Sequence, residues 1–313
     1  MPNPEAVVPP DRVYTLDDLE SWTFAGPSLA VLGQPVTHSL SPIMHRAALA
    51  ELSKEDSKFA RWSYFRFAVD ADDLESALPR FHAKGFLGLN LTVPHKVRAV
   101  ELVKSIDPSA REMGAVNTLV AQEEGYAGYN TDGEGLSHAV REELGRPLKD
   151  REVVLMGAGG AARAIAVQLL KEGCRKLWIG NRNPQRLHEL MKALQPPFVE
   201  EAPRVVGFAF DEIPETLPEA PLIINATTQG LKKDDSLPMS LDHFGDGTQI
   251  YDTTYGCANI WRRTADARSW DYADGLAMLV AQGAFSLQRW TGKPVRLETM
   301  RAAVALALAP RLA

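Results

Sequence analysis

The chain has 313 residues, of which 45% are hydrophobic and 24% are charged, as in ordinary globular proteins, and the length suits about two domains. Its formal net charge of -6 argues against a nucleic-acid-binding surface, because such a surface needs a basic stripe. A small anionic ligand is not excluded, since one local cationic pocket would bind it.

Two cysteines, Cys174 and Cys257, form neither a disulfide framework nor a CxxC zinc motif, so we expect reduced thiols in a cytoplasmic protein. Residues 1–18 hold prolines and acids but no cationic segment followed by an apolar one, which argues against a signal peptide. No apolar run reaches the length of a membrane span, so we expect no membrane partner.

The first part of the chain alternates between short apolar runs and helical patterns. Residues 1–27 look like a loosely attached extension, and the regular pattern begins at residue 28. We expect strands at 29–33, 64–69 and 86–90, helices at 42–52, 72–82 and 94–103, and a hairpin of 116–121 with 126–129 closed by Glu124-Gly125.

The second part repeats the alternation with more continuous apolar strands. We expect strands at 152–156, 176–180, 222–225 and 249–252, helices at 161–172 and 275–290, and a buried terminal helix at 302–309. Strands that alternate with crossover helices predict parallel sheets, so the fold class is α/β with a doubly wound sheet.

A glycine-rich turn lies between the strand at 152–156 and the helix that follows. Its spacing is GxGxxG/A, which permits a tight turn, a close approach of a pyrophosphate to the backbone and close packing of helix on strand. The N–H groups at the helix N-terminus would bind phosphates. The alternative interpretation is a structural turn without a ligand. The turn reads Gly157, Ala158, Gly159, Gly160, Ala161 and Ala162.

The end of the next strand indicates which dinucleotide would bind. NAD sites usually carry an acid there for the ribose 2′-hydroxyl, but this strand ends in Asn181 and Arg182, with Arg186 one turn later. Guanidinium groups suit a 2′-phosphate, because they donate bidentate, charge-assisted hydrogen bonds. The sequence therefore favours NADP, although both arginines could instead lie solvated on a helix face.

Two serines precede the helix at 42–52. Ser39 and Ser41 are two residues apart beside a helix N-terminus, an arrangement that would hold a carboxylate. Ser41 also stands where an N-cap belongs, with Pro42 at the first helical position. A plain N-cap and a carboxylate site explain the spacing equally well.

A second polar segment runs from Asn90 to Lys96. Alternation places Asn90 and Thr92 on one face of an extended stretch, and Pro94 then begins a helix with Lys96 in its first turn. A cation there is unfavourable for the helix dipole, which suggests that the charge serves another purpose than helix stability. A solvated surface lysine is the alternative.

Two further polar segments follow, Gly114–Thr118 and Gly128–Gly133. Asp132 follows the expected strand at 126–129 and lies at the expected domain junction. It is either an ordinary N-cap of the next helix or the acid partner of Lys96.

The ordered set of polar and glycine-rich blocks resembles shikimate dehydrogenases. Together the blocks are highly specific, and they cover essentially the whole chain after the extension. They read HSLSPIMH from His38, NLTVPHK from Asn90, GAVNTL from Gly114, GYNTDGEG from Gly128, GAGGAARA from Gly157, NATTQG from Asn225 and DGLAMLVAQGAFSLQRWTG from Asp274.

The resemblance implies reversible NADPH-dependent reduction of 3-dehydroshikimate to shikimate, a step towards aromatic amino acids. Lys96 and Asp132 match the family's catalytic pair. Its substrate-binding residues match Ser39, Ser41, Asn90, Thr92, Asn117, Tyr255 and Gln282. The cofactor-binding residues would be Gly157, Ala158, Gly159, Gly160, Ala161, Asn181, Arg182, Arg186, Thr227 and Gly275.

The family's fold implies a domain organisation in which one domain is inserted into the other. Residues 1–27 would be an extension, 28–131 with 276–313 a substrate-binding catalytic domain, and 132–275 an NADP-binding Rossmann domain. The partner would be a small-molecule substrate, and the chain a monomer or homodimer. No metal is expected, because no carboxylate or cysteine completes a set with His38, His45 and His95.

Three positions depart from the family pattern. Leu231 replaces a common methionine, Arg46 replaces a usual asparagine, and the run Gly256–Trp261 lacks the usual proline and threonine. One alternative within the family is a quinate dehydrogenase. A second alternative, from another class, is a non-catalytic NADP-binding sensor on the same fold, which should lack Lys96 or Asp132. A hydrolase or nucleotide kinase is disfavoured, since no GxSxG, HExxH or P-loop occurs.

Overall fold

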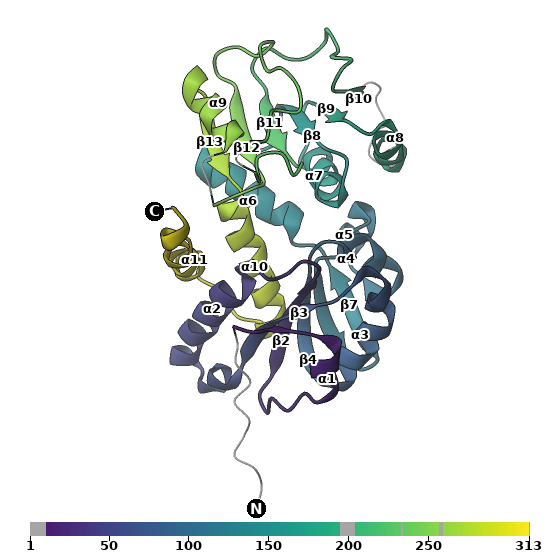
Figure 1. The fold of residues 1–313 in the computed structure, drawn as a ribbon, viewed down its shortest axis with the longest axis vertical. Coiled ribbons are helices and arrows are strands. Elements are labelled where there is room, and N and C mark those ends of the chain that lie inside the picture. The colour runs from purple at the N-terminus through teal and green to yellow at the C-terminus, as the bar shows by residue number, and fades with distance from the viewer. Residues whose placement is uncertain (1–10, 195–203, 233, 257–258, 313) are drawn as a thin grey trace, which may run out of the picture. The chain divides into compact units, whose positions relative to one another are not determined.

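The computed structural model describes residues 11–194, 204–232, 234–256 and 259–312. It divides the chain into two compact units (Figure 1). Unit 1 consists of Met1–Thr131 and Gln282–Pro310, and unit 2 of Asp132–Ala281 and Arg311–Ala313. No helix within the described ranges combines the length and the apolar character that a membrane crossing requires.

Unit 1 is built on a seven-stranded mixed sheet with the order β1-β3-β2-β4-β6-β7-β5. The pairs β4–β6 and β6–β7 are antiparallel, and the others are parallel. The predicted hairpin is confirmed, with Gln122 opposite Gly125. The strands are β1 (Val13–Tyr14), β2 (Ser28–Gly33), β3 (Ser63–Ala68), β4 (Phe86–Leu91), β5 (Ser105–Ile106), β6 (Thr118–Gln122) and β7 (Gly125–Tyr129).

Helices cover both faces of this sheet. In Figure 1, α2 lies to the left of the strands and α3 to the right. The predicted helix at 94–103 is wrong in its second half, because the carbonyl of Ala99 accepts from the N–H of Leu102, which tightens the chain into a 3₁₀ turn. The helices are α1 (Leu16–Glu20), α2 (Ser41–Glu55), α3 (Leu74–Ala83), α4 (His95–Arg98) and α5 (Pro108–Met113), with 3₁₀ turns η1 (Ser57–Arg61), η2 (Ala71–Asp73) and η3 (Ala99–Glu101).

The segment before β2 belongs to the core of unit 1. β1 pairs with β3, and Tyr14 and Leu19 are buried in the same hydrophobic cluster as Phe65 and Phe67. Thr15 caps α1 in a capping box with Asp18. The expectation of a loosely attached extension is therefore wrong for residues 11–27; residues 1–10 lie outside the described part of the chain.

Unit 2 contains a six-stranded sheet with the order β10-β9-β8-β11-β12-β13, and every pair is parallel. The doubly wound α/β fold is thus confirmed. The strand order reverses between β8 and β11, and open sheets of this kind bind ligands outside the carboxyl ends of the strands at that point. The strands are β8 (Glu152–Met156), β9 (Lys176–Asn181), β10 (Val205–Ala209), β11 (Leu222–Asn225), β12 (Gln249–Asp252) and β13 (Asp271–Asp274).

The helices of unit 2 follow the crossovers of its sheet. They are α6 (Asp132–Leu144), α7 (Gly160–Lys171), α8 (Pro184–Ala193) and α9 (Ile260–Arg268). Two helices close the chain, α10 (Leu276–Thr291) and α11 (Leu297–Leu312), and the boundary between the units falls inside α10. The long helix predicted at 275–290 is confirmed by α10. The terminal helix extends well beyond the predicted 302–309, and the expectation that it is buried is wrong, because Leu306 on it is 78% exposed.

Candidate active site

The loop from β2 to α2 carries the two predicted serines of unit 1. The hydroxyl of Ser39 accepts a hydrogen bond from the N–H of Ser41 at 3.3 Å, so both residues lie at the start of α2. The interpretation of Ser41 as N-cap is wrong, because Leu40 occupies the cap position and its side chain makes no capping hydrogen bond. Ser41 is instead the first residue of α2, and its hydroxyl is not used for capping.

The segment after β4 lies between two neighbouring stretches of backbone. The N–H of Thr92 donates to the carbonyl of Leu32 at the end of β2, at 3.0 Å. The carbonyl of Lys96 accepts from the N–H of Val116 at 2.8 Å. Gly33 is required beside Thr92, since a Cβ there would lie 2.3 Å from the threonine methyl carbon. The polar blocks that are separate in the sequence are therefore adjacent in unit 1.

Three predicted residues of unit 1 form one hydrogen-bonded cluster. The side-chain amide of Asn90 donates to the carbonyl of Asn117 at 3.1 Å. The amide of Asn117 donates to Gln282 Oε1 at 3.4 Å. Because amides carry both donors and acceptors, this cluster can bind hydroxyl groups in a fixed orientation.

Three hydroxyl residues without a role predicted from the sequence complete this cluster. Ser286 Oγ lies 2.7 Å from Thr118 Oγ1 and 3.2 Å from Thr131 Oγ1. Thr131 also donates to the carbonyl of Gln282 at 3.0 Å. Thr118 and Thr131 lie inside the blocks GAVNTL and GYNTDGEG. Ser286 follows Gln282 by one helical turn, and this spacing on α10 was the signal that could have identified it.

Tyr64 and His45 pack next to Asn90 of this cluster. The hydroxyl of Tyr64 donates to Asn90 Oδ1 at 2.7 Å, and the His45 ring stacks on the tyrosine with centroids 4.1 Å apart. His45 Nδ1 lies 2.8 Å from the carbonyl oxygen of Ser41. Burial lowers the pKa of His45 to about 4, so this ring is neutral near pH 7 and does not act as a cation.

The two predicted catalytic residues belong to different units. Lys96 is half-buried on α4 in unit 1. Asp132 is buried and is the first residue of α6 in unit 2. Tyr255, which was expected near the substrate, also belongs to unit 2.

The glycine turn of unit 2 has the backbone geometry that phosphate binding requires. Gly157 has a φ of 115°, and a Cβ there would lie 2.9 Å from the carbonyl oxygen of Ala226, so a side chain is excluded. Gly159 precedes the first turn of α7, no side chain caps that helix, and a Cβ at Gly159 would meet nothing within 4 Å. The open space and the uncapped N–H groups suit the pyrophosphate of a dinucleotide.

The arginines predicted to select NADP lie after β9. Asn183 caps α8 by accepting from the N–H of Arg186 at 2.9 Å, and Asn181 donates to the carbonyl of Asn183 at 2.8 Å. Arg182 and Arg186 are exposed, and in the described ranges neither forms an ion pair. Two guanidinium groups are thus available to a 2′-phosphate, as the chemistry of NADP requires.

The loop after β11 lies against the glycine turn. A Cβ at Gly157 would meet Thr227 Cγ2 at 3.2 Å, so the Thr227 side chain lies against the turn. Thr227 is held by Asn225, whose Oδ1 accepts from its N–H at 3.0 Å and its hydroxyl at 2.6 Å. Gly275 donates to the carbonyl of Thr254 at 2.9 Å and has no room for a side chain beside Thr253. These loops form the carboxyl edge of the sheet.

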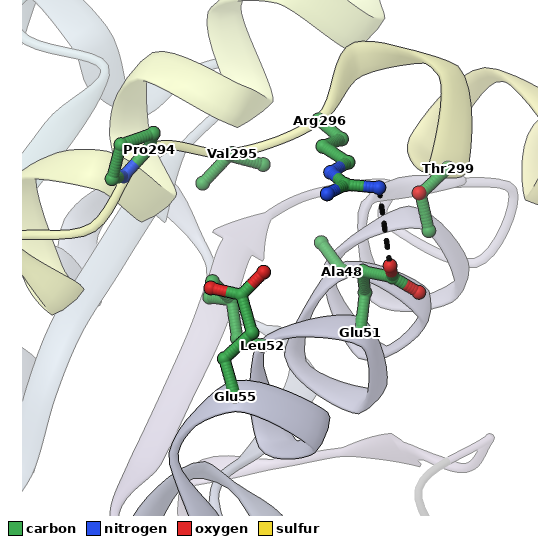
Figure 2. Close-up of a pocket in the computed structure, with 8 residues that line it drawn as sticks. All are labelled: Ala48, Glu51, Leu52, Glu55, Pro294, Val295, Arg296 and Thr299. Carbon is green, nitrogen blue, oxygen red and sulfur yellow. Dashed lines mark ion pairs between the residues drawn. The ribbon is translucent and has the colours of Figure 1, made fainter.

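A pocket of unit 1 shares none of these residues (Figure 2). It lies between α2 and the start of α11, and the Arg296 guanidinium pairs with the Glu51 carboxylate across it at 3.7 Å. We assign it no function. Its lining consists of Ala48, Glu51, Leu52, Glu55, Pro294, Val295, Arg296 and Thr299.

Three stretches of the chain match described protein families. Residues 31–119 match the shikimate dehydrogenase substrate binding domain. Residues 139–232 match the family shikimate / quinate 5-dehydrogenase, and residues 275–305 match the shikimate 5′-dehydrogenase C-terminal domain.

Known relatives cover nearly the whole chain. The shikimate dehydrogenase (NADP(+)) of Moorella thermoacetica is 37% identical over 274 residues, which are 87% of this chain and 90% of the relative. The solved shikimate 5-dehydrogenase of Thermus thermophilus in complex with NADP(H) and shikimate is 34% identical, with a TM-score of 0.76 over 90% of this chain and 99% of that chain. Quinate dehydrogenase of Corynebacterium glutamicum in complex with NAD is 26% identical, with a TM-score of 0.78 over 90% and 99%.

Proposed function

The chain belongs to the shikimate dehydrogenase family, and we propose that it catalyses the reversible NADPH-dependent reduction of 3-dehydroshikimate to shikimate. The observation that carries this proposal is the cluster of amides and hydroxyls in unit 1, together with the half-buried Lys96, whose carbonyl accepts from the N–H of Val116 next to Asn117. A ring with a carboxylate and several hydroxyls needs this set of donors and acceptors.

We assign the carboxylate of the substrate to Ser39 and Ser41, whose positions at the start of α2 add the helix dipole to two hydroxyl donors. The ring hydroxyls would be bound by Asn90, Thr92, Asn117, Gln282 and Tyr255. In this assignment Asn90 acts as an acceptor. Its Nδ2 already donates to Asn117, Thr118 and Ser286, whereas its Oδ1 accepts, among the described residues, from Tyr64 alone.

Lys96 would act on the oxygen of the ketone. NADPH, when bound, supplies the hydride that the ketone carbon receives. Negative charge then develops on the ketone oxygen, and the Lys96 ammonium stabilises that charge and delivers the proton that makes the hydroxyl. We assign Asp132, the first residue of α6, as the second member of the catalytic pair, with the role of completing the proton relay.

The dinucleotide would be held by residues of unit 2. The turn of Gly157, Ala158, Gly159, Gly160 and Ala161 offers backbone N–H groups to the pyrophosphate. We assign the 2′-phosphate to Asn181, Arg182 and Arg186, and the other half of the dinucleotide to the loops that contain Thr227 and Gly275. We propose residues 132–275 as the NADP-binding domain and residues 28–131 with 276–313 as the substrate domain.

We propose the cytoplasm as the location, because Cys174 is a free buried thiol as in reduced proteins; Cys257 lies outside the described residues. Monomer and homodimer both stay predictions.

The test is an absorbance assay of the purified chain with matched substrates. We expect oxidation of NADPH with 3-dehydroshikimate and reduction of NADP with shikimate, both faster than the corresponding reactions with NAD(H). No turnover of 3-dehydroshikimate with NADPH would contradict the proposal. Faster oxidation of quinate with NAD would instead support the second candidate, a quinate dehydrogenase. The 26% identity to the Corynebacterium glutamicum enzyme is the reason to test it.

A further inference from the structure

A buried carboxylate lies at the carboxyl end of β12, in the middle of the loops of unit 2. Asp252 is 0% exposed, and in the described ranges no lysine, arginine or histidine pairs with it. A buried charge without a counter-ion persists only when several hydrogen bonds replace its hydration. The arrangement around Asp252 therefore needs an explanation beyond sheet packing.

Five hydrogen bonds from four segments converge on Asp252. Its Oδ1 accepts from Asn225 Nδ2 at 2.8 Å and from the N–H of Thr254 at 3.0 Å. Its Oδ2 accepts from Thr254 Oγ1 at 2.8 Å, Asn259 Nδ2 at 2.6 Å and the Tyr272 hydroxyl at 3.3 Å. The carboxylate thus joins the end of β11, the loop after β12, the start of α9 and β13.

The bond to Asn225 determines which way that amide faces. Because the amide nitrogen donates to Asp252, the amide oxygen is directed to Thr227, where it accepts from both the N–H and the hydroxyl. The same nitrogen also donates to the carbonyl of Gln229 at 3.0 Å. A reversed amide would place its nitrogen against the N–H of Thr227 and its oxygen against two acceptors, so Asp252 fixes the conformation of the loop after β11.

That loop occupies one defined half of the sheet. The arginines of the proposed 2′-phosphate site follow β9, on one side of the point where the strand order reverses. Thr227 follows β11, on the other side, where it lies against the glycine turn. In doubly wound folds the two halves of a dinucleotide bind on opposite sides of this point. The loop that Asp252 holds therefore faces the nicotinamide half.

We propose that Asp252 is a positioning residue, which shapes the nicotinamide half of the dinucleotide site by holding Asn225 and, through it, Thr227. This inference rests on the proposed function, because it requires that unit 2 binds NADP(H). Because Asp252 itself is fully buried, it would act through the loop.

The test compares two ligands on the full-length Asp252→Asn variant by calorimetric titration. NADPH contacts both halves of the site, whereas adenosine 2′,5′-bisphosphate contacts only the half beside β9. We expect the Kd of NADPH to rise about ten- to a hundredfold, since charge-assisted bonds in a connected network are lost. The Kd of the bisphosphate should stay within about twofold of the wild-type value, because the distant half keeps its contacts.

Asp271→Asn is the matched control. This acid lies on the neighbouring strand β13, is exposed, and accepts from Gln249 Nε2 at 2.8 Å at the opposite end of the sheet. It should leave both affinities unchanged. An unchanged NADPH affinity in Asp252→Asn would overturn the inference, and so would equal weakening of both ligands, which indicates general loosening of unit 2.

Tyr272→Phe gives a second test if Asp252→Asn does not fold, because it removes only the longest of the five bonds. We expect a several-fold weaker NADPH affinity with an unchanged bisphosphate affinity. Wild-type affinity for NADPH in this variant would count against the inference. Failure of the wild-type chain to bind NADPH at all would instead contradict the proposed function.

Discussion

The candidate sites of the two units consist of different kinds of groups. In unit 1 the candidate site consists of side chains, and Asn90, Asn117 and Ser286 are buried in one hydrogen-bonded cluster. In unit 2 the corresponding surface consists of backbone at Gly157 and Gly159, with exposed arginines nearby. A small ring with several hydroxyls needs donors and acceptors at fixed positions, whereas phosphates need only N–H groups, a helix dipole and nearby cations.

The largest expected effect comes from removing the proposed proton donor of unit 1. We predict that Lys96→Ala lowers turnover by about 10²–10⁴-fold, because general acid catalysis typically contributes that much, while NADPH affinity in unit 2 is unchanged. Steady-state rates and a separate binding titration test this. Lys104→Ala, an exposed lysine of the same unit, is the control. Near-normal turnover of Lys96→Ala would refute its assignment.

The comparison also predicts which unit is more sensitive to acid. Burial lowers the folded-state pKa of His45 to about 4, below its unfolded value of 6.5. As the pH falls from 6.5 to 4 the unfolded chain binds the proton first, so the stability of unit 1 is full above pH 6.5 and decreases by about 3 kcal/mol towards pH 4.

Hydrogen-exchange mass spectrometry as a function of pH measures each unit separately. We expect unit 1 to lose protection at higher pH than unit 2, and His45→Gln to reduce the difference between pH 7 and pH 4.5. The exposed His243 provides the control variant His243→Gln. Equal pH dependence of wild type and His45→Gln would exclude this histidine as the cause.

The exposed cations of unit 2 should affect which cofactor is used and leave the substrate site intact. We predict that the catalytic efficiency with NADPH exceeds that with NADH by at least about tenfold, and that Arg182→Ala reduces this ratio about tenfold or more. The KM for shikimate should not change. Arg262→Ala, which removes an exposed ion pair with Asp266 in the same unit, should keep the wild-type ratio. Equal use of both cofactors by the wild type would contradict the arginine assignment.

The smallest effect should come from Tyr64, which donates a hydrogen bond to Asn90 of the unit 1 cluster. Tyr64→Phe removes the donor to Asn90 Oδ1, so we predict a several-fold higher KM for shikimate with little change in kcat or in the KM for NADPH. Tyr126→Phe is matched to it, because this buried hydroxyl of the same unit donates to the carbonyl of Phe86 and not to the cluster. An equal rise in KM in both variants would indicate a loss of folding stability rather than of orientation.

Local patterns predicted the regular elements well. The continuous apolar run of β8 and the glycines after it indicate a buried parallel strand and its turn without any tertiary information. The residues before β2 carried no such signal, because β1 has two residues and α1 has five, which is too short for a period to show. Their place in the core depends on contacts with β3 and α3, which are distant in the sequence.

The sequence could not predict side-chain roles that depend on partners distant in the chain. Ser286 joins the cluster of unit 1 only because α10 returns to residues more than a hundred positions earlier. Asp252 ends a buried strand, and its sequence neighbours do not reveal the five donors that the structure brings to it. Ser41 illustrates the reverse, since its spacing also fits an N-cap that the structure does not form.

Hydrogen exchange of the full chain with one ligand at a time tests the division of binding between the units most directly. We predict that shikimate alone protects segments 33–42, 88–96 and 115–131 of unit 1, and that NADP alone protects segments 157–163, 180–187 and 225–230 of unit 2. Protection of the unit 2 segments by shikimate alone, or of the unit 1 segments by NADP alone without their partners, would contradict this division.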